Sequence, residues 1–113
     1  MITVKVFVDS DGRYKGFRVS GHAGYADAGE DIVCAAVSAL VINTINSIEA
    51  FTEDTFRNAV HEEKDVVTYS ITSRPVGQAA ELLLKSLVLG LEGIEREYGK
   101  QYIKVKIKRK QEV

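Results

Sequence analysis

Cysteine is scarce in this chain of 113 residues, which contains a single one, Cys34. One cysteine excludes a disulfide within the chain. Together with only two histidines, it also falls short of the four Cys or His ligands that a structural zinc site normally takes. The three glycines at 21, 24 and 29 stand too far apart for a phosphate-binding G-x-G-x-x-G loop, and no P-loop lysine follows them. We therefore expect no metal centre and no cofactor.

An excess of charge of one sign is also missing. Fifteen basic residues oppose sixteen acidic ones, for a formal net charge of -1. No overall field then attracts nucleic acid or an anionic membrane, so we expect neither as a partner. The one basic patch lies at residues 104–110. It lacks interleaved aromatic residues for stacking on bases, and lysines on an exposed strand usually deter edge pairing, although such a patch could favour a ribosomal precursor or RNA.

Long hydrophobic runs are absent as well. The longest, residues 32–42, is interrupted by Ser38 and is shorter than the roughly 20 residues that span a bilayer. The opening residues 1–9 alternate between apolar and polar side chains, which indicates a strand rather than a signal peptide. These features predict a soluble, cytoplasmic protein.

What the chain does contain is enough apolar material for one domain. A length of 113 residues and a hydrophobic content of 45% fit a single domain over residues 1–113 with a modest core. Apolar periodicity and turn formers predict strands and helices in the order ββαββαβ. The strands are expected at residues 2–8, 14–20, 55–60, 66–72 and 102–108, and the helices at 31–49, with Asp31 as N-cap, and 75–98.

Several residues are expected to set the ends and faces of these elements. Pro75 suits the first turn of the second helix, and Gly99 suits its end. In the last strand Ile103, Val105 and Ile107 alternate with lysines, which predicts one dry and one wet face. Because hairpins require antiparallel neighbours and two helices can cover one face of a sheet, we predict an α+β, two-layer fold with a mainly antiparallel sheet and two long helices on one face.

Residues 21–40, GHAGYADAGEDIVCAAVSAL, are the most informative stretch of the chain. They place Cys34 in the first turn of the first predicted helix and His22 on the glycine-rich loop before it. Thiol nucleophiles react as thiolates, and a helix N-terminus beside an imidazole is an environment that stabilises a thiolate. The arrangement suggests a cysteine-histidine enzyme.

The same residues allow a structural interpretation. Free cysteine is among the most buried residue types, and the helix carries an apolar stripe that could simply be core. In that case His22 would be a solvated side chain or a turn hydrogen bonder, like the other histidine, His61, to which we assign no chemistry. The predicted stripe consists of Cys34, Val37, Ser38, Val41, Ile45 and Ile48.

The motif resembles the signature of the bacterial ribosomal-processing cysteine proteases of the Prp family. The likeness is carried by G-H-A at residues 21–23 and by G-x-D-I-V-C-A-A-V-S at residues 29–38, and it extends over the whole chain in element order and length. The resemblance implies an endopeptidase that removes the N-terminal extension of a large-subunit ribosomal protein and cuts after paired aromatic residues. It also implies that Cys34 is the nucleophile and His22 the base.

Neighbouring residues then acquire supporting roles. We expect Asp31 to cap the helix and to orient His22, although a carboxylate so near the thiol should oppose its ionisation unless it faces the imidazole. Ser38 lies one turn beyond Cys34 on the same face, where its hydroxyl could reach the site or bond to a backbone carbonyl. Gly21 is the expected hinge of the 21–30 loop, which would form one wall of the substrate groove. The first-turn backbone amides, including that of Cys34, are the candidate oxyanion hole.

Alternatives remain open at this stage. The chain could be a non-enzymatic ribosome-associated or RNA-binding module with Cys34 in its core, or a different cysteine enzyme such as a thioesterase. A further expectation concerns assembly. Gly90 and Gly93 inside the second helix indicate close packing, either on the first helix or on a second copy, and we predict a homodimer.

Overall fold

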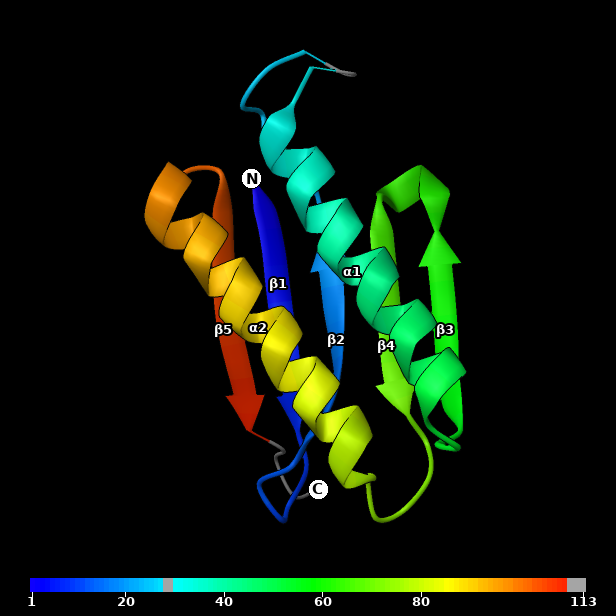
Figure 1. Ribbon diagram of the computed structural model, residues 1–113. Coiled ribbons are helices and arrows are strands. Elements are labelled where there is room, and N and C mark those ends of the chain that lie inside the picture. The colour runs from blue at the N-terminus through cyan, green and yellow to red at the C-terminus, as the bar shows by residue number, and fades with distance from the viewer. Residues whose placement is uncertain (28–29, 110–113) are drawn as a thin grey trace.

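The computed structural model describes residues 1–27 and 30–109. The observed elements follow the predicted order, ββαββαβ, with a short 3-10 helix at Glu62–Lys64 between the third and fourth strands. Two helices lie on one face of a five-stranded sheet (Figure 1). The α+β two-layer prediction is confirmed. The elements are β1 (Ile2–Val8), β2 (Tyr14–Ser20), α1 (Ile32–Phe51), β3 (Phe56–His61), β4 (Val66–Ile71), α2 (Gln78–Tyr98) and β5 (Ile103–Arg109).

The sheet is mixed, with strand order β3-β4-β2-β1-β5. Pairs β1·β2, β2·β4 and β3·β4 are antiparallel, while the last strand, β5, pairs in parallel with the first. This order places β2 in the middle, so the end of β2 lies beside the start of β4, where Ser20 pairs with Val66. The residues that follow Ser20 therefore emerge next to the turn that precedes β4.

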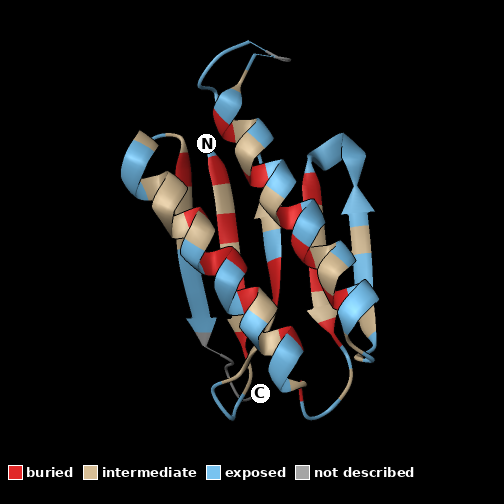
Figure 2. Ribbon diagram, viewed as in Figure 1, coloured by how far each residue is buried: buried red, intermediate tan, exposed pale blue. Residues whose placement is uncertain are grey.

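The core lies between the sheet and the helices. Alternate residues of β1, from Ile2 to Val8, are buried beneath the helices, as the alternating colours along the strand show (Figure 2). Tyr69 of β4 is fully buried and stacks with Phe17 at a ring-centroid distance of 5.5 Å. Burial raises the pKa of Tyr69 to about 12, because the charged phenolate is disfavoured away from water.

Helix α1 turns a slightly different face to the core than the predicted stripe. Its buried residues are Val33, Val37, Val41, Thr44 and Ile48. Cys34 is only half-buried against the core, and Ser38 is exposed. The purely structural interpretation of Cys34 as a core residue is therefore not supported, because the side chain lies at the margin of the packed face.

The length of α1 corrects one expectation from the sequence. The helix, unlike the shorter apolar run at residues 32–42, is long and apolar enough to cross a membrane by length and composition, with a mean hydropathy of 1.6 over an 18-residue window. In the structure one side of this helix packs into the core, through Val33 and Ile48 among others. A core helix meets the same criteria, but here only 28% of the apolar window is buried, and Ile42 and Phe51 remain exposed.

Helix α2 begins later than predicted. Pro75 is not in its first turn but in the loop before it, because the helix starts at Gln78 with Gly77 as N-cap. Gly77 has no side chain to cap the helix, but its N–H donates to the Asp54 carboxylate at 3.0 Å, and this contact holds the start of the helix to another segment. Gly99 ends the helix with φ 110°, as expected.

Two further expectations are met in part. A Cβ on Gly90 would lie 2.9 Å from Leu40 Cδ1, so this glycine does allow α1 and α2 to approach closely. Gly93 has only an ordinary contact, at 3.8 Å from an arginine side chain. In β5 the dry face is incomplete, because Ile103 is buried whereas Ile107 is 39% exposed.

Candidate active site

His22 and Asp65 meet where β2 ends and β4 begins. The strand register brings the two residues together although 43 positions separate them, and His22 Nε2 lies 2.8 Å from Asp65 Oδ2. Both side chains are open to solvent, at 71% and 47% exposure. Asp65 itself adopts a left-handed conformation with φ 52°, which aspartate tolerates better than most residues.

Gly21 fixes the backbone on which His22 is carried. It has φ 86°, and a Cβ at this position would clash with the Met1 carbonyl oxygen. Its N–H donates to the Asp65 carbonyl oxygen at 3.1 Å. The conformation and the close approach both require glycine here, so main chain and side chain hold the start of the loop to the turn before β4.

Asp31 is the N-cap of α1, as predicted. Its Oδ1 accepts hydrogen bonds from the N–H groups of Val33 and Cys34, each at 3.0 Å. Its Oδ2 accepts from the Tyr25 N–H at 3.0 Å. The hydrogen bond from the Cys34 N–H holds the pKa of the Asp31 carboxyl below its usual range, because it stabilises the ionised form.

This cap corrects two expectations. The first-turn N–H groups of Val33 and Cys34 are not free to form an oxyanion hole, because the Asp31 carboxylate already occupies them. In the structure Asp31 does not contact His22 either; its hydrogen bonds go to the backbone N–H groups of the helix start and of the loop. The carboxylate in contact with His22 is that of Asp65.

The donor to the Cys34 sulfur comes from the loop. The N–H of Ala23 lies 3.2 Å from Cys34 Sγ. Ala23 is 3% exposed and belongs to the core cluster, so this donor is held in place by packing. A backbone N–H directed at sulfur stabilises negative charge there. The sequence motif contained Ala23, but only the folded loop shows where its N–H points.

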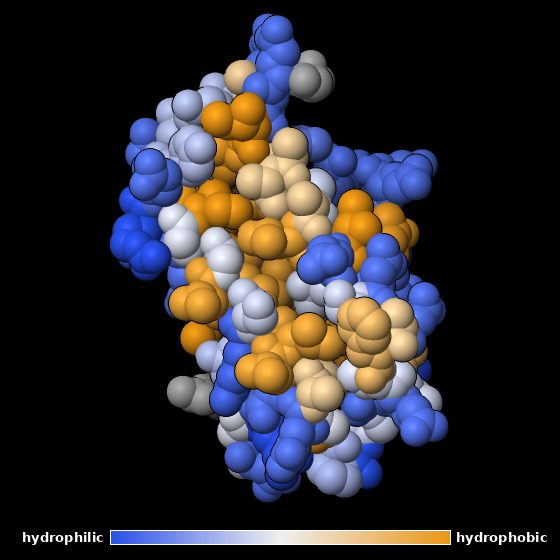
Figure 3. Space-filling view, in the orientation of Figure 1, coloured by the Kyte–Doolittle hydropathy of each residue, from blue (hydrophilic) through white to orange (hydrophobic). Residues whose placement is uncertain are grey.

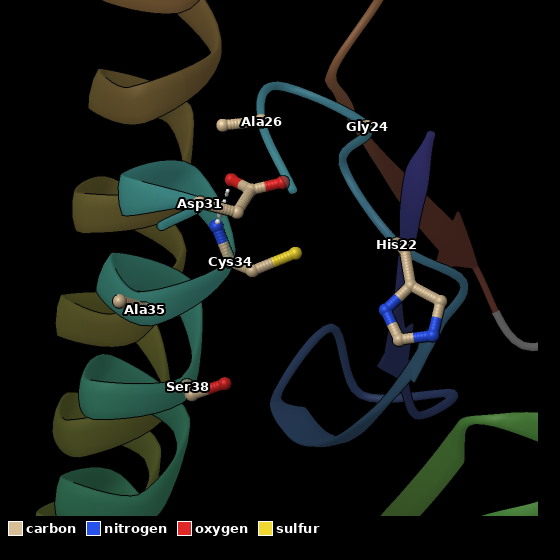
Figure 4. Close-up of a pocket in the computed structure, with 7 residues that line it drawn as sticks. All are labelled: His22, Gly24, Ala26, Asp31, Cys34, Ala35 and Ser38. Carbon is tan, nitrogen blue, oxygen red and sulfur yellow. Dashed lines mark hydrogen bonds between the residues drawn. The ribbon is translucent and has the colours of Figure 1, made fainter. Parts of the chain in front are cut away.

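A cleft of about 480 Å³ joins these groups. In Figure 4 the Cys34 sulfur points from α1 toward the loop that carries His22, and one ring nitrogen of His22 faces the Cys34 side. His22 and Cys34 are both described, and no hydrogen bond links them; His22 is paired with Asp65 and Cys34 with Ala23. The cleft is lined by His22, Gly24, Ala26, Asp31, Cys34, Ala35 and Ser38.

Three tyrosines anchor the loop that walls the cleft. The Tyr25 ring makes edge-to-face contacts with the rings of Tyr98 and Tyr102. The ring-centroid distances are 5.6 Å and 5.1 Å. Such edge-to-face contacts add stability beyond simple burial. The loop before α1 is therefore tied to the end of α2 and the start of β5. Of the predicted loop, residues 28–29 lie outside the described residues.

The described residues contain no cluster of side chains suited to bind a metal ion. Over residues 1–27 and 30–109, no group of three or more His, Cys, Asp or Glu side chains is arranged to hold a metal ion. The groups brought together at the cleft are instead a thiol, an imidazole, a carboxylate and backbone donors. This set suits nucleophilic catalysis with proton transfer.

A family model described as cysteine protease Prp matches residues 1–111. The chain belongs to this family. The Prp resemblance stated from residues 21–40 is thus confirmed over nearly the whole chain, and the chain is a cysteine protease. The family assignment sets aside the non-enzymatic module and the thioesterase that the sequence alone left open.

Named relatives and solved structures agree with the Prp assignment. The ribosomal processing cysteine protease Prp of Staphylococcus aureus is 31% identical over 99 residues, which cover 87% of this chain and 92% of the relative. The Bacillus subtilis Prp is 29% identical, over 73% of this chain and 76% of its own length.

Two of the solved structures are of an S. aureus Prp with bound peptide. The one with a covalently linked product peptide superposes with a TM-score of 0.88 at 28% identity and covers 96% of this chain and 100% of that one. The one with a substrate peptide has a TM-score of 0.83 at 27% identity, with the same coverage. The fold described above is therefore the Prp fold.

Proposed function

We propose that this Prp-family chain removes the N-terminal extension of a bacterial large-subunit ribosomal protein, with Cys34 as nucleophile and His22 as base. The observation that carries the proposal is the open cleft in which the half-buried Cys34 sulfur faces the His22 loop. The ribosomal processing named for the S. aureus and B. subtilis relatives, and the peptides bound to the S. aureus structures, support it. A cytoplasmic location remains a prediction.

The reaction begins with transfer of the Cys34 thiol proton to His22. Since Nε2 faces Asp65, Nδ1 is the nitrogen available to take the proton. The two side chains are not bonded in this structure, so the loop or the imidazole shifts when substrate binds. The sulfur then attacks the scissile carbonyl carbon and forms a tetrahedral intermediate with a negatively charged oxygen.

Collapse of the intermediate completes acyl transfer. His22 gives its proton to the leaving amine as the peptide bond breaks, which leaves a thioester on Cys34. Water, deprotonated by His22, then hydrolyses the thioester and restores the thiol. We assign the Ala23 N–H as an oxyanion donor, because it is held beside the sulfur by a buried residue and is released when the sulfur becomes acylated.

The cleft walls suit bulky groups on the substrate. Gly24, Ala26 and Ala35 present small side chains to the cleft, so the space is left to the ligand. Paired aromatic residues before the scissile bond would fill it and bury their rings. The expected hinge at Gly21 is compatible with the loop geometry and also remains a proposal.

Substitution of these substrate aromatics by alanine is expected to lower kcat/KM at least tenfold, because a buried aromatic ring contributes about 2 kcal/mol or more. The measurement is cleavage of synthetic precursor peptides, followed by mass spectrometry. A peptide with alanine at a non-aromatic position serves as control, and a small thioester tests for thioesterase activity. Equal rates on native and alanine-substituted peptides would contradict an aromatic-specific groove.

Asp65 is the positioning residue that the sequence did not reveal. Its carboxylate holds one nitrogen of His22, which fixes the ring so that the other nitrogen faces the cleft. It also stabilises the imidazolium that forms when His22 accepts the thiol proton. Because the pair is exposed, its effect on catalysis should be modest.

Asp65→Asn is expected to lower kcat by about twofold to fivefold with little change in KM, which is the range that exposed ion pairs support. Asparagine tolerates the left-handed conformation of residue 65, and the backbone bond to Gly21 is retained. Asp65→Glu should recover part of the loss, whereas Asp27→Asn, which removes another exposed loop carboxylate, should leave kcat unchanged. A change confined to KM would indicate a binding role instead.

We also propose that the protein is a homodimer. The outer side of the helix layer carries exposed apolar side chains, among them Ile42, Leu82 and Leu89, at 58%, 67% and 71% exposure. Figure 3 shows apolar side chains gathered on this face of the molecule. A second copy related by a two-fold axis could cover them. Since Gly90 is already explained by Leu40, the exposed residues rather than the glycines support the dimer.

Sedimentation equilibrium at micromolar concentration should give twice the monomer mass. The double variant Leu82→Ser/Leu89→Ser should shift the mass toward the monomer, because it removes apolar area from the contact. Val60→Ser/Ile107→Ser, which changes two exposed apolar residues of the edge strands β3 and β5, is the matched control and should not. A monomeric mass for the unmodified protein would reject the dimer.

A further inference from the structure

The face of the sheet opposite the helices is basic. No described element covers it, since both helices lie on the other side (Figure 1). Thr3, Lys5 and Phe7 of β1 lie on this face, because the residues that alternate with them are buried beneath the helices. Paired residues share a face, so the strand registers place their partners on β2 and β5, and the partners of those residues on β4 and β3, on the same face. Its charged residues are all cations, with no Asp or Glu among the described strand positions: Lys5, Arg18, Arg57, Lys104, Lys106 and Lys108.

Three of these cations form a row across β2, β1 and the edge strand β5. Lys5 of β1 is directly opposite Arg18 of β2 on one side and Lys106 of β5 on the other. Neighbouring strands lie about 4.8 Å apart, and like charges placed directly opposite destabilise a sheet. No carboxylate of the described strands lies among them. A bound polyanion would relieve the repulsion.

The rest of this face carries an aromatic ring and hydroxyl groups, which can contact the base and the ribose of a nucleotide. Phe7 is half-buried on it, between Gly16, which has no side chain, and Lys108. The exposed part of the ring offers a stacking surface to an unpaired base. Hydroxyl groups line the neighbouring strand positions and can bond to a ribose 2′-OH. They belong to Thr3, Ser20, Thr68 and Ser70.

We propose that this face binds single-stranded RNA, with the row of cations on phosphates and Phe7 stacked on a base. The proposal goes beyond the protease activity and departs from the expectation drawn from the net charge of -1. Strand pairing segregates the cations onto one face, which composition cannot show. Single strands fit better than duplex because Phe7 needs an unstacked base. A membrane fits less well, because the face offers one apolar ring rather than an apolar surface.

Fluorescence anisotropy with a labelled oligouridine of about 12 nucleotides, within the usual site size of single-strand binders, tests the proposal. The unmodified protein should bind, and the triple variant Lys5→Gln/Arg18→Gln/Lys106→Gln should bind at least tenfold more weakly. The slope of log affinity against log salt should fall by about 2, since each phosphate contact on a single strand contributes roughly 0.7. Phe7→Leu, which keeps an apolar side chain, should weaken binding at least about fivefold through lost stacking.

The matched control is Lys85→Gln/Arg96→Gln/Lys100→Gln, which removes two lysines and one arginine that are exposed on or just after α2. It should bind oligouridine within about twofold of the unmodified protein, as expected for charges outside the contact. Both triple variants should cleave the precursor peptide normally, which separates this test from that of the protease assignment. No binding, equal loss in both triple variants, equal affinity for oligothymidine, or binding only to anionic phosphatidylserine vesicles would each overturn the proposal.

Discussion

Cys34→Ala is expected to lower the rate of precursor cleavage by at least about 10⁴-fold, because it removes the thiol that attacks the scissile carbonyl and carries the acyl group. The free energy of unfolding should change by less than about 1 kcal/mol, since the truncation removes one atom from a half-buried side chain. Single-turnover cleavage of the precursor and thermal unfolding measure the two quantities on the same sample.

Ser47→Ala is the matched control for this substitution. It also removes one heavy atom from a half-buried position of α1, and it should retain full activity. In the unmodified protein, iodoacetamide should label Cys34 in the folded state and abolish cleavage. Residual processing by Cys34→Ala would show that another group is the nucleophile, and unfolding of the variant would return Cys34 to a structural role.

His22→Ala is expected to lower kcat by about 10³-fold, which lies within the usual contribution of a general acid–base group. The variant loses both the acceptor of the thiol proton and the donor to the leaving amine. Its stability should remain close to that of the unmodified protein, because the His22 side chain is 71% exposed and its ion pair with Asp65 is exposed as well.

The chain supplies its own control for this result in His61→Ala. His61 is the other histidine and is exposed at the end of β3. The His61→Ala variant should cleave the precursor at the normal rate. If His22→Ala keeps more than about a tenth of the activity, the enzyme does not use it as the general base that the mechanism requires.

Most of the fold could be predicted from the sequence, because each helix and strand shows its own hydrophobic periodicity within a short stretch of residues. Period-two alternation in residues 2–8 and helical spacing in residues 80–98 gave the elements within a few residues. The start of the second helix was predicted too early, because proline is common in the first turn of a helix. In the structure Pro75 lies in the loop before α2, and Gly77 at the helix start is held by the Asp54 carboxylate from another segment. Such a contact depends on how distant segments meet.

The candidate site divides in the same way. His22, Cys34 and the capping role of Asp31 follow from one continuous motif. Asp65 could not be found, because its place beside His22 follows from the pairing of β4 with β2, and nothing near residue 65 indicates that neighbour. The occupied first-turn amides could have been anticipated, since a capping carboxylate takes up those donors by definition.

The contact between Tyr25 and Tyr102 has a consequence for when the enzyme becomes competent during its own synthesis. The wall of the cleft is braced by a residue just before β5, and β5 completes the sheet by pairing in parallel with the first strand. A nascent chain that has not yet released its last strand from the ribosome lacks both the brace and the sheet edge. The wall of the cleft should therefore reach its braced form only once β5 and the residues before it have folded onto the sheet, so the site is completed late in folding.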